Sequence, residues 1–550
     1  MSEQARARFG IDKEQLSPDE LIHELLKSPV DLIWNGGIGT YVKATSETHA
    51  DVGDKANDHI RVDARELRAK AFGEGGNLGM SQRARVEFAL QGGAVNTDFI
   101  DNAGGVDCSD HEVNLKILLN QLIADGDMTR KQRNELLLSM TEDVSELVLT
   151  NNFRQAQALS LAERQARYRL SEYQRFITRM EIDARLDRKL EGVPGDDVLS
   201  ERAATGKSLT RPELAVLLSY SKTHLKERLI AGQVHRDPVV AEAVFEEFPA
   251  VIRERFDAAV RKHRLFPEIV ATMVANDIVH HLGITSVVHL SEFVGGEVDE
   301  IARAYYAAAA CFGIREKFRA VEGLPGVAGE PKLEMLLELM QLARRATRWL
   351  MRHRRVDLNV AKLTEYFSPR IAALADHTVG IMGTAGSARW RERAQARVEL
   401  GVPQDVADVT SNAAALAITL PLIDAAERTG ASPDAVAGVF AAMNESLGFD
   451  WLAEQTMALA ATSLWQSMER DALVDELVTQ HAALAAMALR SANGATGADA
   501  VTRWMESQAH LVATWRQALD SAQRASSQDF SLFSMTLRKL GDLTRALASA

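Results

Sequence analysis

The pattern of hydrophobic and polar positions divides the chain into a short mixed segment and a long helical one. Val30 to Trp34 is a short apolar run closed by Asn35-Gly36-Gly37, and such a run predicts a buried strand. Lys70 to Phe72 and Val95 to Asp101 predict two further strands, each followed by a loop that contains glycines. Glycine at these points favours a sharp change of chain direction.

Helices are expected between and after these strands. Ser17 and Glu20 have the spacing of a capping box, which predicts a helix that ends near residue 28. A second helix is predicted from Ser81 to Leu90, and a third begins near Ser109. Strand, glycine loop and helix in repeated order predict a parallel sheet.

After residue 114 the strand-like alternation disappears and amphipathic helices follow one another. Thr129 with Gln132, and Thr210 with Glu213, again have capping-box spacing. The predicted fold is therefore mainly α. It begins with a partial α/β, Rossmann-like domain over residues 1–125 and continues as a large all-helical region over residues 126–550, with candidate subdivisions near 193 and 325.

Composition narrows the class of protein. A chain of 550 residues is too long for one hydrophobic core, and 46% hydrophobic with 25% charged residues is ordinary for a globular protein. The formal net charge of −13 gives no basic footprint, so no nucleic-acid partner is expected. The arginines between Arg344 and Arg355 predict a charged helix face or an interdomain salt-bridge surface.

Cysteines and apolar runs bear on location. Cys108 and Cys311 are the only cysteines, which excludes a disulfide framework and fits a reducing compartment. The first ten residues contain no apolar stretch of the kind that a signal peptide needs. The apolar run from Ala304 to Gly313 is too short to cross a bilayer. We therefore expect a cytoplasmic protein without a membrane partner.

Three loops carry the candidate chemistry, at residues 35–40, 74–77 and 102–105. The carboxyl ends of parallel strands lie at one edge of a sheet, where ligands bind. Glycines let the backbone approach a ligand closely, and asparagine offers the donor and the acceptor that a carboxamide such as nicotinamide requires. Each loop alone could be an ordinary tight turn. Three at equivalent strand ends favour a ligand site.

Several other motifs are incomplete. Gly37-Ile38-Gly39 lacks the third glycine of the dinucleotide fingerprint, and Leu78 occupies that glycine's position after Gly73-Glu74-Gly75. Gly206-Lys207-Ser208 has Glu201 where a phosphate loop needs its first glycine. No metal site is expected, since Leu115 stands where a zinc helix that begins at His111 needs its second histidine.

The three loops resemble segments of the large bacterial NAD-specific glutamate dehydrogenases. The first resembling segment runs from Leu32 to Ala44 and reads LIWNGGIGTYVKA. Glu74-Gly75-Gly76-Asn77 is similar to that family's Glu-Gly-Ala-Asn turn, and Asn102-Ala103-Gly104-Gly105-Val106 with Ser109 is similar to its Asn-Ala-Gly-Gly-Val-x-x-Ser stretch. Residues 209–215, LTRPELA, also resemble the helical C-terminal region of the family.

The resemblance implies oxidative deamination of L-glutamate to 2-oxoglutarate and ammonia, with NAD as cofactor. It implies that Asn77 and Asn102 face the nicotinamide, and that Val106 and Ser109 line the pocket for the substrate's side-chain carboxylate, which a hydroxyl suits as a donor. The residues expected to bind the cofactor are Asn35, Gly36, Gly37, Glu74, Gly76, Asn77 and Asn102.

The sequence also departs from the family pattern. Gly76 replaces the alanine of the Glu-Gly-Ala-Asn turn, and Asp110 to Val113 stand where smaller members have aromatic residues. By the resemblance, the catalytic lysine and aspartate and the glycine fingerprint belong to an earlier part of the family's sequence. We therefore expect no catalytic residue in this chain, no activity of the chain alone, and a homo-oligomer for the full-length enzyme.

Two alternatives remain open at this point. The chain could be a non-catalytic helical module for oligomerisation or regulation that retains part of a Rossmann-like domain. It could also belong to a dehydrogenase for leucine or phenylalanine, which Ser109 disfavours because an apolar substrate side chain gives a hydroxyl donor no partner.

Overall fold

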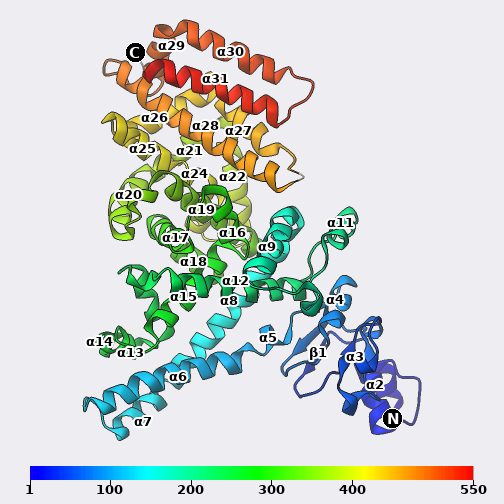
Figure 1. Ribbon diagram of the computed structural model, residues 1–550. Helices are drawn as coiled ribbons and strands as arrows, with labels where there is room; N and C mark the ends of the chain where they lie inside the picture. The colour runs from blue at the N-terminus through cyan, green and yellow to red at the C-terminus, as the bar shows by residue number, and fades with distance from the viewer. Residues whose placement is uncertain (462, 549–550) are drawn as a thin grey trace. The chain divides into compact units, whose positions relative to one another are not determined.

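The computed structural model describes residues 1–461 and 463–548. The chain divides into two compact units, residues 1–288 and 289–550 (Figure 1). The smaller boundaries predicted near residues 125, 193 and 325 stay predictions.

Helices dominate both units, as the sequence predicts. The helices of the first unit are α1 (Glu3–Phe9), α2 (Pro18–Leu26), α3 (His49–Val52), α4 (Gln82–Leu90), α5 (Asp98–Asp101), α6 (Ala103–Ala124), α7 (Arg130–Ser139), α8 (Thr141–Tyr168), α9 (Leu170–Asp183), α10 (Arg188–Glu191), α11 (Asp196–Ala204), α12 (Arg211–Ala231), α13 (Ala250–Arg255), α14 (Asp257–Val260) and α15 (Phe266–Leu282). Helix α16 (Ser286–Val294) contains the division between the units.

The second unit is built from helices throughout its described residues. They are α17 (Val298–Phe312), α18 (Ile314–Glu322), α19 (Gly329–His353), α20 (Val360–Leu374), α21 (Thr378–Ile381), α22 (Gly383–Glu399), α23 (Gln404–Ser411), α24 (Ala413–Leu416), α25 (Thr419–Thr429), α26 (Pro433–Leu447), α27 (Phe449–Ala458), α28 (Leu464–Ser491), α29 (Gly497–Ser507), α30 (Ala509–Gln523) and α31 (Phe530–Ala548). The 3-10 helices of the chain are η1 (Lys55–Asn57), η2 (Ala64–Glu66), η3 (Val234–Arg236), η4 (Val240–Glu247), η5 (Arg355–Asp357) and η6 (Ala375–His377).

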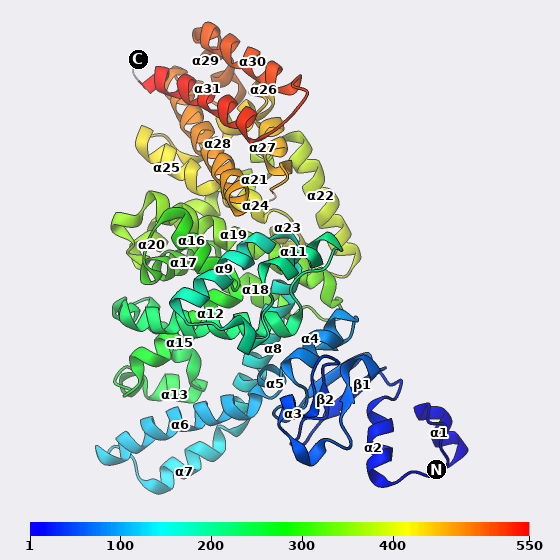
Figure 2. The same ribbon diagram turned by 45° about the vertical axis from the view of Figure 1, so that its right-hand side comes forward.

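A small parallel sheet lies near the start of the first unit, drawn in blue in Figures 1 and 2. Its strands are β1 (Leu32–Asn35), β4 (Ala71–Glu74) and β5 (Ala94–Val95), in the order β1-β4-β5. A second parallel pair joins β2 (Val42–Lys43) to β3 (Val62–Asp63). These few strands agree with the predicted parallel sheet, while the assignment of residues 1–125 to a Rossmann-like domain stays a prediction.

The segment β4-α4-β5 is a βαβ unit whose helix covers one face of the sheet. Ser81 caps α4, because its side chain accepts a hydrogen bond from the Ala84 N–H. Ala84 and Phe88 of this helix pack with Phe72 and Val95 of the strands in one buried cluster. This packing fixes β4 and β5 side by side and so places the loops that follow them.

Strand β1 is not the buried strand that its composition predicts. Ile33 packs against the hydrophobic cluster, but Leu32 is 56% exposed and Trp34 is 59% exposed. The physical reason is that β1 is an edge strand with alternating faces, and the residues of this chain cover only one of them. An apolar run therefore does not guarantee burial on both sides.

The third predicted strand is also wrong over most of its length. Strand β5 ends at Val95, and Asp98 to Asp101 form the short helix α5. Residues 103–105, predicted as a loop, are the first turn of α6, which therefore begins before Ser109. The acidic residues at positions 98 and 101 favour the beginning of a helix, where carboxylates interact well with free N–H groups.

The helix starts predicted from capping boxes are confirmed. Capping boxes begin α2 at Ser17, α7 at Thr129 and α12 at Thr210. Within the second unit, the arginines of the basic cluster form ion pairs, for example Arg348 with Asp471 and Asp475 of α28. The predicted salt bridges are therefore present, and these two lie within one unit, so an interdomain surface stays a prediction.

One helix in the described part of the chain, α28, has the length and hydropathy of a membrane span. Of its most apolar stretch, 44% is buried inside the structure, and core helices of ordinary proteins reach the same values. Its Asp471 and Asp475 carboxylates bind Arg348 of α19. Length and composition alone therefore give only weak evidence for a membrane role.

Candidate cofactor and substrate site

The loops after β1 and β4 begin side by side. Asn35 and Glu74, the last residues of these strands, are register partners in the sheet. Beyond them the two loops touch, because a Cβ atom added to Gly76 would lie 2.5 Å from the Gly37 carbonyl oxygen. Glycine at position 76 is therefore what permits this close approach.

Trp34 and Asn35 flank this contact on opposite faces of β1. The indole of Trp34 lies over the glycines of β4 and its loop, since a Cβ at Gly73 or Gly75 would come within 2.6 or 2.7 Å of the ring. On the other face, the side-chain Oδ1 of Asn35 accepts a hydrogen bond from the Gly37 N–H at 3.4 Å. The buried Nδ2 of Asn35 has no hydrogen-bond partner in the described chain.

Glu74 lies in the interior. Its side chain is 0% exposed, and its carboxylate accepts hydrogen bonds from Arg85 Nε at 2.6 Å, Arg85 Nη2 at 2.9 Å and the Met80 N–H at 2.9 Å. Burial raises the pKa of Glu74, although the hydrogen bonds and charge of Arg85 and the hydrogen bond from Met80 oppose the rise. The buried Glu74 side chain thus fixes the loop that carries Asn77, because it binds the Met80 N–H at the end of that loop.

Two aspartates of α5 also hold the same loop. The Asp98 carboxylate accepts a hydrogen bond from the Leu78 N–H at 2.8 Å and lies 3.1 Å from Arg85 Nη2. The Asp101 carboxylate accepts one from the Glu74 N–H at 3.0 Å. Sequence reasoning missed Arg85, Asp98 and Asp101. No local pattern indicated these contacts, because Arg85, Asp98 and Asp101 meet Glu74 and its loop only in the folded chain.

Asn77 and Asn102 meet at the edge of the sheet. Asn102 lies between α5 and α6, and its Nδ2 donates a hydrogen bond of 2.7 Å to Asn77 Oδ1. This bond leaves the amide donors of Asn77 and the carbonyl oxygen of Asn102 without another partner among the described residues. The two side chains together offer a donor and an acceptor, which is the complement of a carboxamide.

Val106 and Ser109 lie on one exposed side of α6, whose ribbon leads away from the sheet in Figures 1 and 2. The Ser109 hydroxyl donates a hydrogen bond of 3.1 Å to the Gly105 carbonyl oxygen in the preceding turn. To donate to a ligand, this hydroxyl must turn away from Gly105. Both residues lie within the first two turns of α6, the helix that begins directly after Asn102.

The sequence matches two family descriptions. "Bacterial NAD-glutamate dehydrogenase, catalytic domain" matches residues 1–162, and "Glutamate dehydrogenase, C-terminal" matches residues 206–542. The chain belongs to the glutamate dehydrogenase family. The resemblance seen in the three loops is thereby confirmed.

Relatives within this glutamate dehydrogenase family match nearly the whole chain. NAD-specific glutamate dehydrogenases of Pseudomonas aeruginosa, Halomonas elongata and Mycobacterium tuberculosis are 47%, 42% and 35% identical to it. The matches cover 98%, 100% and 99% of this chain but 34% of each relative. The chain thus spans about a third of the length of these relatives.

A hollow of about 780 Å³ lies beside the sheet, within the first unit. Trp34 and Asn96 line one side, and Arg167, Lys207 and Arg211 line another. Arg211 bonds Asn96 Oδ1 and donates to Ser160 Oγ at 2.8 Å. Lys207, part of the incomplete phosphate loop, donates to the Leu90 carbonyl oxygen at 3.2 Å.

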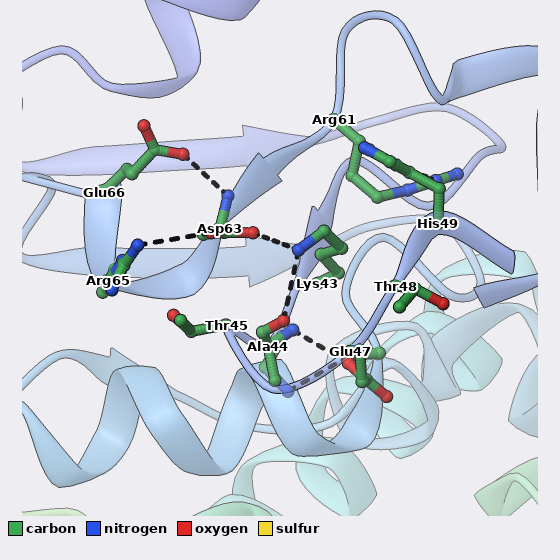
Figure 3. Close-up of polar contacts among 12 residues, drawn as sticks. Lys43, Ala44, Thr45, Glu47, Thr48, His49, Arg61, Asp63, Arg65 and Glu66 are labelled. Atoms are coloured by element: carbon green, nitrogen blue, oxygen red, sulfur yellow. Dashed lines mark hydrogen bonds and ion pairs between the residues drawn. The ribbon is translucent and has the colours of Figure 1, made fainter. Parts of the chain in front are cut away.

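Lys43 lies in the segment 32–44 that resembles the family, and its side chain is paired within the fold. As Figure 3 shows, its ammonium group pairs with the Asp63 carboxylate across the β2–β3 ladder and donates to the Ala44 carbonyl oxygen at 3.4 Å. Asp63 is fixed in turn, because its N–H donates to Glu66 at 2.9 Å. This lysine therefore joins two short strands. Among the described residues, no group of three or more His, Cys, Asp or Glu side chains is arranged to hold a metal ion.

Proposed function

We propose that this chain forms part of an NAD-dependent glutamate dehydrogenase, which converts L-glutamate, NAD⁺ and water to 2-oxoglutarate, ammonium, NADH and a proton. The observation that carries the proposal is the Asn77–Asn102 hydrogen bond of 2.7 Å, which joins two family loops at the carboxyl edge of a parallel sheet. Ligands bind at that edge in open α/β sheets.

The residues present fit the nicotinamide end of NAD. The unpaired Nδ2 of Asn35 and the unused polar atoms of Asn77 and Asn102 suit a carboxamide. Gly37 and Gly76 approach each other closely and have no side chains that would block a ligand there. Gly36 extends the same loop, and Glu74 acts from the interior by holding the loop in place. When bound, NAD accepts the hydride that leaves the substrate carbon.

Val106 and Ser109 would bind the substrate end of the site. The Ser109 hydroxyl would donate to the side-chain carboxylate of glutamate after it leaves the Gly105 carbonyl oxygen. Val106, 66% exposed, would cover the apolar methylene groups of the substrate. We assign no group of this chain to proton transfer, because the resemblance implies that the catalytic lysine and aspartate lie in another part of the enzyme.

The proposal extends to domain organisation and location. Residues 1–125 would complete one half of a Rossmann-like NAD-binding domain, and residues 126–550 would form a helical C-terminal domain. We also propose that the whole enzyme is a cytoplasmic homo-oligomer. Light scattering after size-exclusion chromatography would test the last point, and a strictly monomeric enzyme would contradict it.

The activity test uses a chimera with the full length of the Pseudomonas aeruginosa relative. In this chimera the present sequence replaces the region of the relative that it matches. We expect glutamate-dependent reduction of NAD by the chimera and none by the 550-residue chain alone. Asn77→Ala with Asn102→Ala should lower kcat/KM at least about tenfold, which is the effect of losing about 1.4 kcal/mol of binding in the transition state. A folded chimera without activity would overturn the proposal.

Binding of NADH provides a second measurement, in case the chimera assembles poorly. The double asparagine variant should weaken binding of NADH to the chimera, whereas Asn134→Ala, an exposed asparagine on α7, should leave it unchanged. Equal weakening by both changes would show that the effect is general and would argue against the assignment of Asn77 and Asn102.

A further inference from the structure

Helix α6 has two faces with opposite character. Val106 and Ser109 are exposed on one face, whereas His111 is only 1% exposed and faces α8 and η4. Asp107 lies one turn before His111 on the same buried side. The position of the two turns that carry the proposed substrate residues therefore depends on the contacts that Asp107 and His111 make with α8 and η4.

His111 lies between two carboxylates. Its Nδ1 is 3.1 Å from Glu247 Oε1 and 3.0 Å from the Glu247 carbonyl oxygen, so both neighbours are acceptors and Nδ1 carries a proton. Its Nε2 is 3.8 Å from Asp107 Oδ1 and 3.5 Å from Asn151 Nδ2. A protonated ring forms an ion pair with Asp107, whereas the Nε2 of a neutral ring can accept a hydrogen bond from Asn151.

The acidic side chains around the ring are themselves held. Asn114 Nδ2 donates to Glu247 Oε1 at 2.9 Å, and Asn151 Nδ2 donates to Asp107 Oδ2 at 3.1 Å. Burial lowers the pKa of His111, but the hydrogen bond and charge of Glu247 and the charge of Asp107 outweigh it, so the pKa is raised. Burial raises the pKa of Asp107.

Other titratable groups face this site from the surrounding elements. Asp110 lies on α6 itself, Lys222 reaches Asp107 electrostatically from α12, and His263 contacts Asn114 from the chain after α14. Burial lowers the pKa of Lys222 to about 8 and also lowers the pKa of His263. His263 Nδ1 accepts a hydrogen bond from the Leu265 N–H at 3.0 Å, which a protonated ring could not do.

We propose that Asp107, His111 and Glu247 form a pH-dependent clamp, in which protonated His111 fixes the first turns of α6 against η4 and thereby positions Val106 and Ser109. His111 is a positioning residue, and its consequence for substrate binding rests on the proposed function above. Because its folded pKa is raised, the stabilisation is fully present below the unfolded pKa of about 6.5 and is lost as the pH rises through the folded pKa.

Lys222 acts in the opposite direction. Its folded pKa is lowered, so its neutral form is favoured in the folded chain and stability rises as the pH passes upward through about 8. Lys222→Met removes this second titration and leaves that of His111. The two contributions can therefore be separated.

The test is hydrogen exchange of residues 103–114 in the complete 550-residue chain, between about pH 6 and about pH 9, corrected for the intrinsic exchange rate. We expect a several-fold loss of protection as the pH rises in the natural sequence and in Lys222→Met. His111→Gln should abolish this loss and leave only the opposite trend from Lys222, whereas the matched control His263→Gln should keep the loss. Unchanged pH dependence in a folded His111→Gln variant would overturn the proposal.

A titration of His111 by NMR in the unsubstituted chain covers the case in which His111→Gln does not fold. A pKa at or below the ordinary value for histidine would overturn the proposal. None of these measurements requires NAD or glutamate, so their outcome is separate from that of the proposed function. In the active chimera, the KM for glutamate should rise several-fold with pH, and His111→Gln should abolish that rise.

Discussion

Gly76 illustrates how a single residue decides the geometry of the candidate site. The related turn carries alanine at this position in the pattern that the sequence resembles, but here a Cβ would lie 2.5 Å from the Gly37 carbonyl oxygen. The departure from the family pattern therefore has a steric cause. A glycine at position 76 allows the two strand-end loops of this chain to touch.

Gly76→Ala should destabilise the contact between these loops by about 1–3 kcal/mol, because either the backbone or the added methyl group must move. Gly37→Ala is the matched control, since a Cβ there meets nothing within 4 Å. Chemical unfolding monitored by the fluorescence of Trp34, the one tryptophan before residue 289, would report the difference once the later tryptophans are replaced by phenylalanine. Equal stability of the two variants would contradict the steric argument.

Arg85 compensates a carboxylate that is shut off from water. Arg85→Gln should cost about 3–5 kcal/mol at neutral pH, because Glu74 would be left charged and poorly paired in the interior. Burial already raises the folded pKa of Glu74 above its unfolded value, and loss of Arg85 raises it further. The folded variant therefore takes up a proton as the pH falls, and the loss should shrink through that range.

Urea unfolding at a series of pH values measures this loss. Arg83→Gln, an exposed neighbour on α4, serves as the control and should change stability little. A loss for Arg85→Gln that stays constant as the pH falls would show that the buried charge of Glu74 is not the cause.

At the scale of elements, the beginning of α12 connects the helical part of the first unit to the sheet. Its capping box uses Thr210 and Glu213, and the buried Glu213 carboxylate also binds Arg202 at 2.9 Å. Arg211, the residue after Thr210, donates hydrogen bonds to Asn96, which follows β5, and to Ser160 of α8. One helix terminus therefore fixes both α8 and the segment that leads to Asn102.

Thr210→Ala should destabilise the first unit by about 1–2 kcal/mol, since the cap is lost in a buried setting. The matched change Thr129→Ala removes the exposed capping box of α7 and should cost less, at about 0.5–1 kcal/mol. Thermal unfolding monitored by circular dichroism compares the two variants. A larger loss at Thr129 would indicate that burial does not set the cost of the cap.

At the scale of the whole molecule, the chain contains two compact units with separate interiors. The first is organised around the parallel sheet and its helices, and the second around helices such as α19 and α28. In the second unit, Arg348 is 6% exposed and bonds Asp471 and Asp475. A substitution at Arg348 therefore changes the stability of the second unit without altering a contact of the first.

Differential scanning calorimetry should resolve two unfolding transitions. Arg85→Gln should lower the midpoint of only one, and Arg348→Met should lower only the other, because the lost pairs lie in different units. A single transition that both variants shift equally would show that the chain unfolds as one cooperative body.

The sequence by itself determined the properties that depend on near neighbours in the chain. Capping boxes at Ser17, Thr129 and Thr210 predicted helix starts correctly, since a cap needs only residues three positions apart. The loop motifs identified the family because residue types and spacing are local as well. The mainly helical fold followed from the same short-range patterns.

The tertiary structure decided everything that depends on which distant segments meet. It left one face of β1 exposed, converted residues 98–101 into a helix, and joined Asn102 to Asn77. It also brought Glu247 to His111, 136 positions away in the sequence. Burial and long-range pairing arise from packing of whole elements, which no local pattern encodes.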